Sequence, residues 1–318
     1  MVRLSKLSVL STAVFSFLLL VTLAQFYLLP SLQLEGPVEF DMFGIHPQGP
    51  RIPQIIHQSW KTSELPKRFE KWANTWKRHH PTWTYVLWTD DMNRRLIETS
   101  FPWFLDLYDA LPKNINRADA SRYFYMYKYG GVYADLDMEC LRAMDAPYDK
   151  DQPSLTDRAS ALIAFMGTNT QFEHSLPNAW MASAPGHPFW MFVVNEMIKA
   201  RSSGKSGTEE LTGPVVLHSA WKIYSQLNVT EVNRLVALDH EFIFPYDWSN
   251  SDGFVEVCSA QLSTLDEKEC KRRLNAEGKP GQKAYALTYW SHTWEPERAN
   301  QDILDNPAND TTNTTKSQ

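Results

Sequence analysis

Four charged residues near the middle of the chain have the types and spacing that metal and sugar phosphate chemistry requires. Asp135 and Asp137 are two residues apart after an apolar run, and Asp119 and Arg122 are three residues apart upstream. Two carboxylates on one side of a strand can hold a hard divalent cation and leave coordination positions for a diphosphate. A carboxylate beside a guanidinium matches the donors and acceptors of a polyol. We therefore expect the four groups to converge on one polyol phosphate ligand.

Each of these pairs also has a structural interpretation. Asp119 and Arg122 could form an ion pair along one helix face. Asp135 and Asp137 could be a solvated pair at the end of a strand. The sequence leaves both alternatives open.

The elements that must position these groups follow from the local pattern. Residues 116–129 favour a helix, because their residues recur at helical spacing without a proline, and Gly130 with Gly131 ends it. From Val132 the pattern alternates as in a strand, so Tyr133 faces the same side as both aspartates. A glycine turn between the two elements would bring their polar faces together.

Other residues are candidates for the same site, each with an alternative. Tyr133 could pack on a ligand or belong to the core, and Arg117 could contact a diphosphate or cap the local structure. His292 lies between aromatic residues, where an imidazole could bind a metal or reach a diphosphate, or could be satisfied by backbone. His57 and His218 are weaker candidates.

The order of elements predicts an α/β fold with a parallel or mixed sheet and crossover helices. Strands are expected at 52–60, 84–89, 162–165, 241–246 and 284–289, and helices from 66, from 90, over 188–199 and from 214. The Asp90 and Asp91 pair follows a strand, and we expect it to cap the next helix rather than bind a metal.

Composition limits the class of protein. The chain has 318 residues, of which 43% are hydrophobic, enough for one large core, and its net charge of −6 gives no reason to expect nucleic acid. Cys258 and Cys270 flank a polar loop and could pair, which leaves Cys140 as a buried thiol. The cysteine spacing does not fit a zinc site.

The first residues predict membrane attachment. Residues 7–29 are uncharged and apolar, and Arg3 and Lys6 precede them, which favours an uncleaved signal anchor over the alternative of a cleaved signal peptide. The predicted organisation is a cytosolic tail at 1–6, a transmembrane helix at 7–29, a stem at 30–50, a lumenal domain at 51–298 and a disordered tail at 299–318. Sequons at Asn228, Asn309 and Asn313 are consistent with a lumenal domain.

Four motifs together resemble glycosyltransferase family 32, the sugar transferases with a DxD motif. They are IPQIIHQSWK at 52–61, RADASRYFYMYKYGGVYADLDMECL at 117–141, LTGPVVL at 211–217 and YWSHTWE at 289–295. The resemblance implies a GT-A fold, a Rossmann-like mixed sheet with helices on both faces, a nucleotide sugar donor and Mn²⁺ or Mg²⁺. The spacing of the four charged residues is also similar to that of the clostridial glucosylating toxins.

The resemblance also implies roles for individual residues. Asp119 and Arg122 would hold the donor hexose, Asp135 would contact sugar or ribose and help with the metal, and Asp137 would bind the metal directly. These four are the catalytic candidates. The implied donor-binding set is Ile56, His57, Gln58, Trp60, Arg117, Asp119, Arg122, Tyr133 and Asp135, and the implied metal set is Asp135, Asp137 and His292.

By the same resemblance the protein would be a retaining α-mannosyltransferase of the Golgi membrane, using GDP-mannose and a mannose-containing glycan such as an N-glycan or mannoprotein. Other Golgi glycosyltransferases would be candidate partners. An inositol phosphoceramide mannosyltransferase is one alternative, and a transferase that uses UDP-glucose or UDP-galactose is another. A third alternative is an inactive lumenal glycan-binding or scaffold protein.

Overall fold

The computed structural model describes residues 51–247, 253–276 and 278–291. The predicted anchor, stem and tail, together with His292, Asn309 and Asn313, lie outside these ranges. The chain divides into two units, Met1–Phe43 and Gly44–Gln318, and the described residues all belong to the second. Within them, no helix combines the length and the apolar character needed to cross a membrane.

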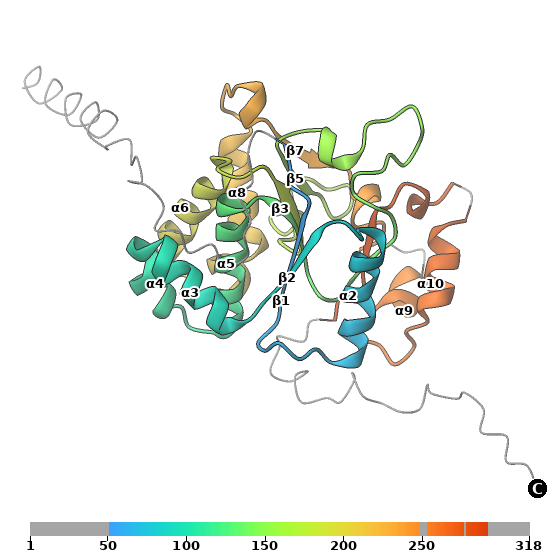
Figure 1. Ribbon diagram of the computed structural model, residues 1–318, viewed down its shortest axis with the longest axis horizontal. Helices are drawn as coiled ribbons and strands as arrows, with labels where there is room; N and C mark the ends of the chain where they lie inside the picture. The colour runs from blue at the N-terminus through green and yellow to red at the C-terminus, as the bar shows by residue number, and fades with distance from the viewer. Residues whose placement is uncertain (1–50, 248–252, 277, 292–318) are drawn as a thin grey trace, which may run out of the picture. The chain divides into compact units, whose positions relative to one another are not determined.

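A six-stranded mixed sheet forms the centre of the described unit, with strand order β2, β1, β3, β6, β5, β7 (Figure 1). Strand β1 pairs in parallel with β2 and β3, β6 runs antiparallel to β3 and β5, and β7 is parallel to β5. The bounds are Ile55–Ser59 (β1), Thr84–Trp88 (β2), Gly131–Ala134 (β3), Ala161–Ala164 (β5), Trp180–Ser183 (β6) and Leu235–Leu238 (β7). The predicted mixed α/β sheet is thus confirmed.

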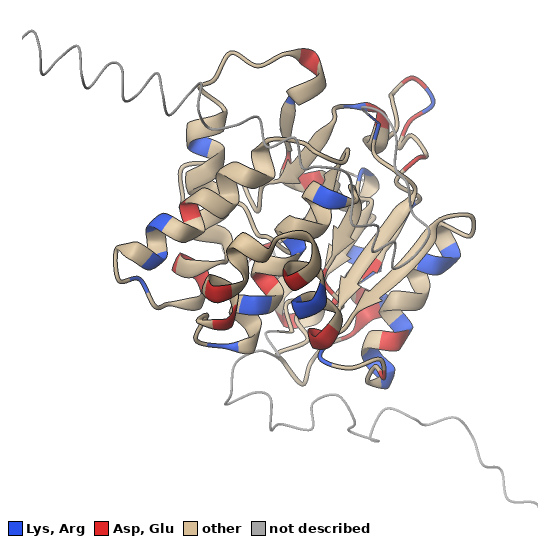
Figure 2. Cartoon of the chain, turned by 60° about the vertical axis from the view of Figure 1, so that its left-hand side comes forward, with Lys and Arg blue, Asp and Glu red and all other residues tan. Residues whose placement is uncertain are grey.

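Helices cover both faces of this sheet. In Figure 1, α3, α4, α5, α6 and α8 lie on one side, and α2, α9 and α10 lie on the other. The helix bounds are Lys67–His79 (α2), Asp90–Ser100 (α3), Leu105–Asp109 (α4), Asn114–Lys128 (α5), Phe189–Ser202 (α6), Thr208–Leu211 (α7), Pro214–Tyr224 (α8), Phe254–Cys258 (α9) and Glu267–Leu274 (α10). Because both faces are covered, the six strands contain no Lys, Arg, Asp or Glu, and the charged residues gather on helices and loops (Figure 2).

The turn from α5 into β3 requires glycine twice. Gly130 and Gly131 have φ values of 65° and 90°, which L side chains rarely adopt. A Cβ atom on Gly130 would lie 2.5 Å from the Ser183 carbonyl oxygen, and one on Gly131 would lie 2.7 Å from that of Ile55. The glycine pair therefore ends α5 before β3, as the sequence pattern predicts, and lets β3 enter between β1 and β6.

A second, two-stranded sheet brings the last described residues back to the centre of the chain. Strand β4 (Met138–Cys140) pairs antiparallel with β8 (Ala286–Thr288), and the Tyr289 amide donates to the Asp137 carbonyl at 2.9 Å. A disulfide joins Cys258 to Cys270, and Cys140 is a buried free thiol, so both cysteine predictions are confirmed. This arrangement places the C-terminal strand beside the acidic motif.

Three local predictions are wrong. Strand β3 ends at Ala134, and Asp135 and Asp137 lie in the turn that joins β3 to β4 rather than along one strand. Residues 241–246 do not form a strand, because Pro245 cannot donate to a ladder, and a 3₁₀ turn, His240–Phe242, begins there instead. The cap of α3 is Thr89, whose side chain accepts from the Met92 amide at 3.2 Å.

Candidate active site

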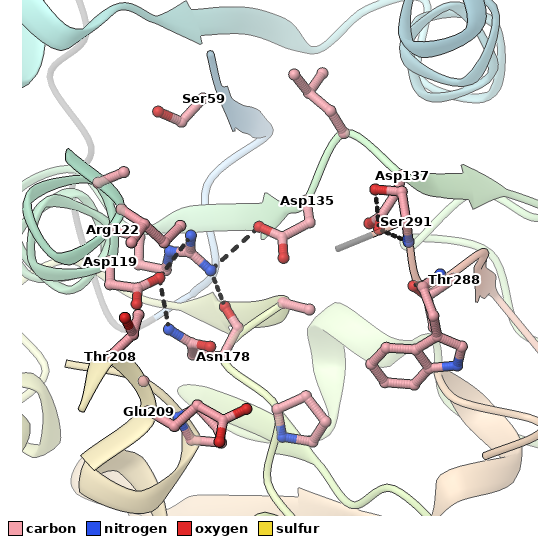
Figure 3. A pocket seen from close by; sticks show the side chains of 18 of the residues that line it. Ser59, Asp119, Arg122, Asp135, Asp137, Asn178, Thr208, Glu209, Thr288 and Ser291 are labelled. Atoms are coloured by element: carbon pink, nitrogen blue, oxygen red, sulfur yellow. Dashed lines mark hydrogen bonds and ion pairs between the residues drawn. The ribbon is translucent and has the colours of Figure 1, made fainter. Parts of the chain in front are cut away.

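A cleft of about 970 Å³ opens where β1 and β3 end. One wall is a face of α5, and other parts come from the turn after β3, from the loop before β6 and from Ser291 (Figure 3). The carboxyl ends of parallel strands are the usual position for ligands in open α/β sheets. The lining includes Asp119, Arg122, Asp135 and Asp137, so the structure brings all four predicted catalytic residues to one cavity.

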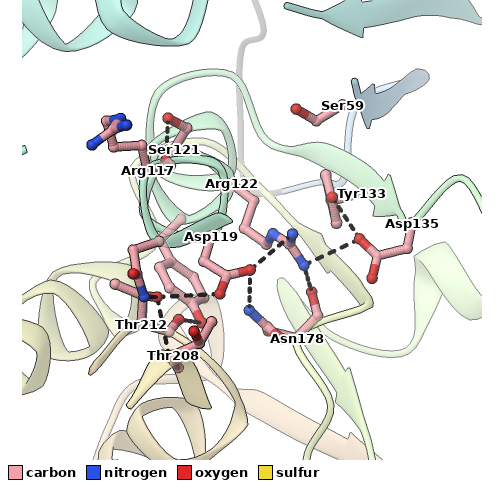
Figure 4. Close-up of polar contacts among 12 residues, drawn as sticks. Ser59, Arg117, Asp119, Ser121, Arg122, Tyr133, Asp135, Asn178, Thr208 and Thr212 are labelled. Carbon is pink, nitrogen blue, oxygen red and sulfur yellow. Dashed lines mark hydrogen bonds and ion pairs between the residues drawn. The ribbon is translucent and has the colours of Figure 1, made fainter. Parts of the chain in front are cut away.

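Arg122 links the two elements of the site. Its side chain is only 5% exposed, and its guanidinium contacts Asp119 at 2.9 Å and Asp135 at 3.1 Å (Figure 4). One of its nitrogens also donates to the Asn178 carbonyl at 2.7 Å. The guanidinium lies over the Tyr133 ring, 4.6 Å from the ring centre. Burial alone would lower the pKa of Arg122, but Asp135, Tyr133 and Asp119 together raise it, so the cation is permanent.

Asp119 is held by two neutral donors, Asn178 and Thr212. One carboxylate oxygen accepts from the Asn178 amide at 3.1 Å, and the other accepts from the Thr212 hydroxyl at 3.1 Å. Asn116 in turn donates to Thr212 at 2.9 Å. Burial raises the pKa of Asp119 to about 6, although Arg122 opposes this shift. The hydrogen bonds fix the carboxylate beside the guanidinium.

Asp135 connects this network to the open part of the cleft. Its Oδ1 accepts from the Tyr133 hydroxyl at 2.7 Å, and its carbonyl accepts from Gln58 at 3.1 Å. Its side chain is 30% exposed, compared with 6% for Asp119. Loss of water around it raises the pKa of Asp135 to about 6, and Arg122 opposes the rise. Asp135 therefore presents a carboxylate both to Arg122 and to a ligand.

Asp137 is oriented by Ser291. One carboxylate oxygen accepts from the Ser291 amide at 2.8 Å and from its hydroxyl at 2.9 Å. Burial raises the pKa of Asp137, and the bonds from Ser291 act in the opposite direction. A carboxylate that accepts two hydrogen bonds on one oxygen has a fixed direction. Figure 3 shows Asp135 and Asp137 on the same side of the cavity.

The two carboxylates fit a hard divalent cation. Among the described residues no cluster of three or more His, Cys, Asp or Glu side chains could hold a metal. Asp135 and Asp137 both line the cleft and supply oxygen ligands, which Mn²⁺ and Mg²⁺ accept. A site with so few protein ligands suits an ion that completes its coordination with a diphosphate and water.

The remaining predicted donor residues divide into two groups. Trp60 and Tyr133 line the cleft, whereas Ile56, His57, Gln58 and Arg117 are not part of its wall as the described residues form it. The two imidazole nitrogens of His57 contact the Gly130 carbonyl at 2.8 Å and the Trp88 indole at 3.0 Å, and burial lowers its pKa to about 4.

Arg117 and His218 have backbone partners. Arg117 donates to the Leu111 carbonyl at 2.7 Å and also bonds the Asn114 side chain. The Nε2 atom of His218 lies 3.0 Å from the Thr170 carbonyl oxygen. These contacts favour the local capping alternative for Arg117 and a packing role for His218. The sequon residue Asn228 is exposed.

Sequence reasoning missed Asn178, Thr212 and Ser291. Asn178 precedes β6, Thr212 lies in the LTGPVVL motif and Ser291 lies in the YWSHTWE motif, but nothing in their local pattern ties them to a carboxylate. The signal that could have found Thr212 and Ser291 is their place inside motifs that carried the family resemblance.

Comparison with known proteins supports an enzyme class for this site. Residues 66–155 match the family described as "Glycosyltransferase sugar-binding region containing DXD motif". This range contains Asp119, Arg122, Asp135 and Asp137. The match confirms the resemblance to a DxD sugar transferase family that the motifs indicate.

The curated relatives that the chain matches include several mannosyltransferases. Inositol phosphoceramide mannosyltransferase 3 of Schizosaccharomyces pombe is 37% identical over 227 residues, which cover 65% of this chain and 59% of the relative. A mannosyl phosphorylinositol ceramide synthase of Saccharomyces cerevisiae is 33% identical over 72% of this chain and 56% of its own length. The initiation-specific alpha-1,6-mannosyltransferase of Candida albicans is 33% identical over 30% of this chain and 26% of its own length. The chain spans about half the length of the inositol phosphoceramide relatives.

A solved structure, the PaToxG glycosyltransferase, aligns with 55% of this chain and 69% of its own chain. Its sequence identity is 16% and the TM-score is 0.40, a likeness too slight to define the fold.

Proposed function

We propose that this protein is a metal-dependent glycosyltransferase with a GT-A fold that transfers mannose from GDP-mannose with retention of configuration. The observation that carries the proposal is the Arg122 guanidinium between Asp119 and Asp135, in one cleft with Asp137. The family of residues 66–155 supports sugar transfer, and the mannosyltransferases among the relatives support mannose.

The protein's own residues would bind and orient the donor. Asp119 accepts hydrogen bonds from hexose hydroxyls while Arg122 donates to them, because the two groups stand side by side and are fixed by Asn178 and Thr212. Preorganised groups of this kind cost no rearrangement when the substrate reacts.

Asp135 and Asp137 would hold Mn²⁺ or Mg²⁺. When bound, the ion stabilises the negative charge that a departing diphosphate acquires. Ser291 keeps Asp137 in one orientation, and Tyr133 does so for Asp135. We assign retention to attack on the same face as the leaving group, in which the departing phosphate takes the acceptor proton. Trapping of a covalent glycosyl enzyme on a carboxylate would contradict this assignment.

We propose an inositol phosphoceramide-type lipid as the acceptor, ahead of the mannose-containing glycan that the motifs favoured. Relatives named for inositol phosphoceramide mannosylation match 65% and 72% of the chain, whereas the initiation-specific α-1,6-mannosyltransferase matches 30%. The glycan acceptor remains the second candidate because an initiation-specific alpha-1,6-mannosyltransferase is 33% identical over 30% of this chain. The anchor at 7–29, a Golgi location and association with other Golgi glycosyltransferases belong to the same proposal.

The test is a panel of donors and acceptors. The purified full chain is incubated with Mn²⁺ and with GDP-mannose, UDP-glucose or UDP-galactose, each with inositol phosphoceramide or an α-mannan oligosaccharide. The expected result is mannose transfer from GDP-mannose to the lipid. Preference for a uridine donor would refute the donor assignment, and transfer to the oligosaccharide alone would favour the second candidate. No transfer or donor hydrolysis by the folded chain would favour a scaffold or glycan-binding protein.

A further inference from the structure

A second part of the cleft wall also carries charged residues. Trp60 and Lys61 follow β1, Asp90 begins α3 just after β2, and Lys113 and Asn114 lie at the start of α5; all five line the cleft. The Trp60 amide donates to the Trp88 carbonyl at 2.9 Å, which places Trp60 beside the end of β2. Trp60 directly follows β1, and β1 pairs with β3, which leads to Asp135 and Asp137. A nucleotide sugar whose diphosphate lies at these two carboxylates can therefore extend its nucleoside toward Trp60.

Asp90 lies in the first turn of α3, where the helix dipole favours a carboxylate, but this position does not use its capacity to accept hydrogen bonds. Thr89, not Asp90, caps α3, and within the described part of the chain the Asp90 carboxylate accepts no hydrogen bond. The residue is half-buried in the cleft wall. Burial raises its pKa, whereas Arg117 and Lys61 lower it, so both cations are close enough to favour the ionised form. A half-buried carboxylate without a protein donor keeps its oxygens free to accept from a ligand.

Trp60 provides an aromatic ring on which a nucleobase can stack. Its ring lines the same part of the cleft and packs against Phe69, with the ring centres 5.0 Å apart. Nucleobases stack on such rings with little regard to their identity. Selection of one base must then come from the groups that meet its edge.

We infer that Asp90 accepts hydrogen bonds from the guanine of the donor and thereby selects a guanosine nucleotide over a uridine nucleotide. Guanine presents two adjacent donors, N1–H and the 2-amino group, which the two oxygens of one carboxylate can accept together. Uracil presents a single N–H between two carbonyl oxygens, and those oxygens would repel a carboxylate. The inference rests on the proposed GDP-mannose donor and assigns recognition of its guanine base to Asp90.

The test measures the affinity of the purified full chain for GDP, IDP and UDP at constant Mn²⁺ by calorimetry. IDP lacks only the 2-amino group of GDP. The wild type is expected to prefer GDP over both. In Asp90→Asn, GDP affinity should fall about 10- to 100-fold, the usual range for a bidentate base contact, and the preference for GDP over IDP should disappear. UDP affinity should not fall.

Asp91→Asn is the matched control, because Asp91 is the next carboxylate in the same helical turn and is exposed. It should bind all three nucleotides as the wild type does. An unchanged ratio of GDP to IDP affinity in Asp90→Asn would overturn the inference and leave the proposed function intact. Equal losses for GDP and UDP would also overturn it, since they would indicate contact with the ribose. A wild type that prefers UDP would refute the donor assignment itself.

Discussion

Replacing Arg122 with methionine removes the cation between Asp119 and Asp135 while it keeps much of the side-chain volume. Both carboxylates then lose the charge that opposes the effect of burial on their pKa. Removing one partner of a buried ion pair typically costs about 3–5 kcal/mol. Because the Arg122 and Asp119 side chains are 5% and 6% exposed, we expect a loss in this range at pH 7.5.

The size of the loss should depend on pH. The pKa values of Asp119 and Asp135 are already about 6, and they should rise further without Arg122. Below the raised pKa these carboxyls are protonated and neutral, so their burial costs less. The destabilisation of Arg122→Met should therefore be smaller at pH 5 than at pH 7.5.

Urea unfolding followed by tryptophan fluorescence at both pH values measures this effect. Arg94→Met is the control, since Arg94 pairs with Asp109 at 2.8 Å but both side chains are more than 40% exposed. Because the pair is solvated, its loss is expected to change the free energy of unfolding far less than the loss of Arg122. A cost below about 1 kcal/mol for Arg122→Met, or an equal cost at both pH values, would show that the guanidinium does not hold the site together.

Three further predictions concern the stability of the structure that supports the site. Gly130→Ala should lower the free energy of unfolding by more than about 2 kcal/mol, because its Cβ would meet the Ser183 carbonyl; denaturant titration measures this, and a smaller loss would mean that the turn can relax. The pKa of His57 is lowered from 6.5 to about 4, so its contribution to stability is complete above pH 6.5 and is lost as pH falls toward 4. The stability difference between wild type and His57→Gln should thus shrink by about 2 kcal/mol from pH 7 to pH 5, and a constant difference would contradict this. Replacing Cys258 and Cys270 with serine should cost about 2–4 kcal/mol in thermal unfolding, and an unchanged midpoint would show that the disulfide adds nothing.

The sequence predicts the parts of the site that depend on short spacings. The turn between α5 and β3 follows from Gly130 and Gly131, and Asp119 and Arg122 share a face because they are one helical turn apart. Packing of α2 on its Trp72 and Trp76 face also follows from a 3.6-residue period. Such features need no knowledge of distant residues.

Contacts between distant segments could not be predicted in this way. Ser291 reaches Asp137 across 154 positions, through the pairing of β8 with β4. Asn178 meets Asp119 because β6 lies beside β3 in the sheet, and a single sequence does not reveal strand order. The residue type of Asp90 predicts a helix cap, and only the geometry shows that Thr89 caps α3 instead.

The most direct test of the central claim compares wild type with Asp137→Ala in Mn²⁺-dependent turnover of GDP-mannose. Asp137 is bonded to Ser291 at the cleft wall and makes no ion pair among the described residues, so its removal should leave the fold intact by circular dichroism. The account predicts that wild type transfers or hydrolyses mannose and that the variant loses at least about 100-fold in rate. A variant that turns over GDP-mannose at the wild-type rate would contradict the assignment of Asp135 and Asp137 to the metal and diphosphate.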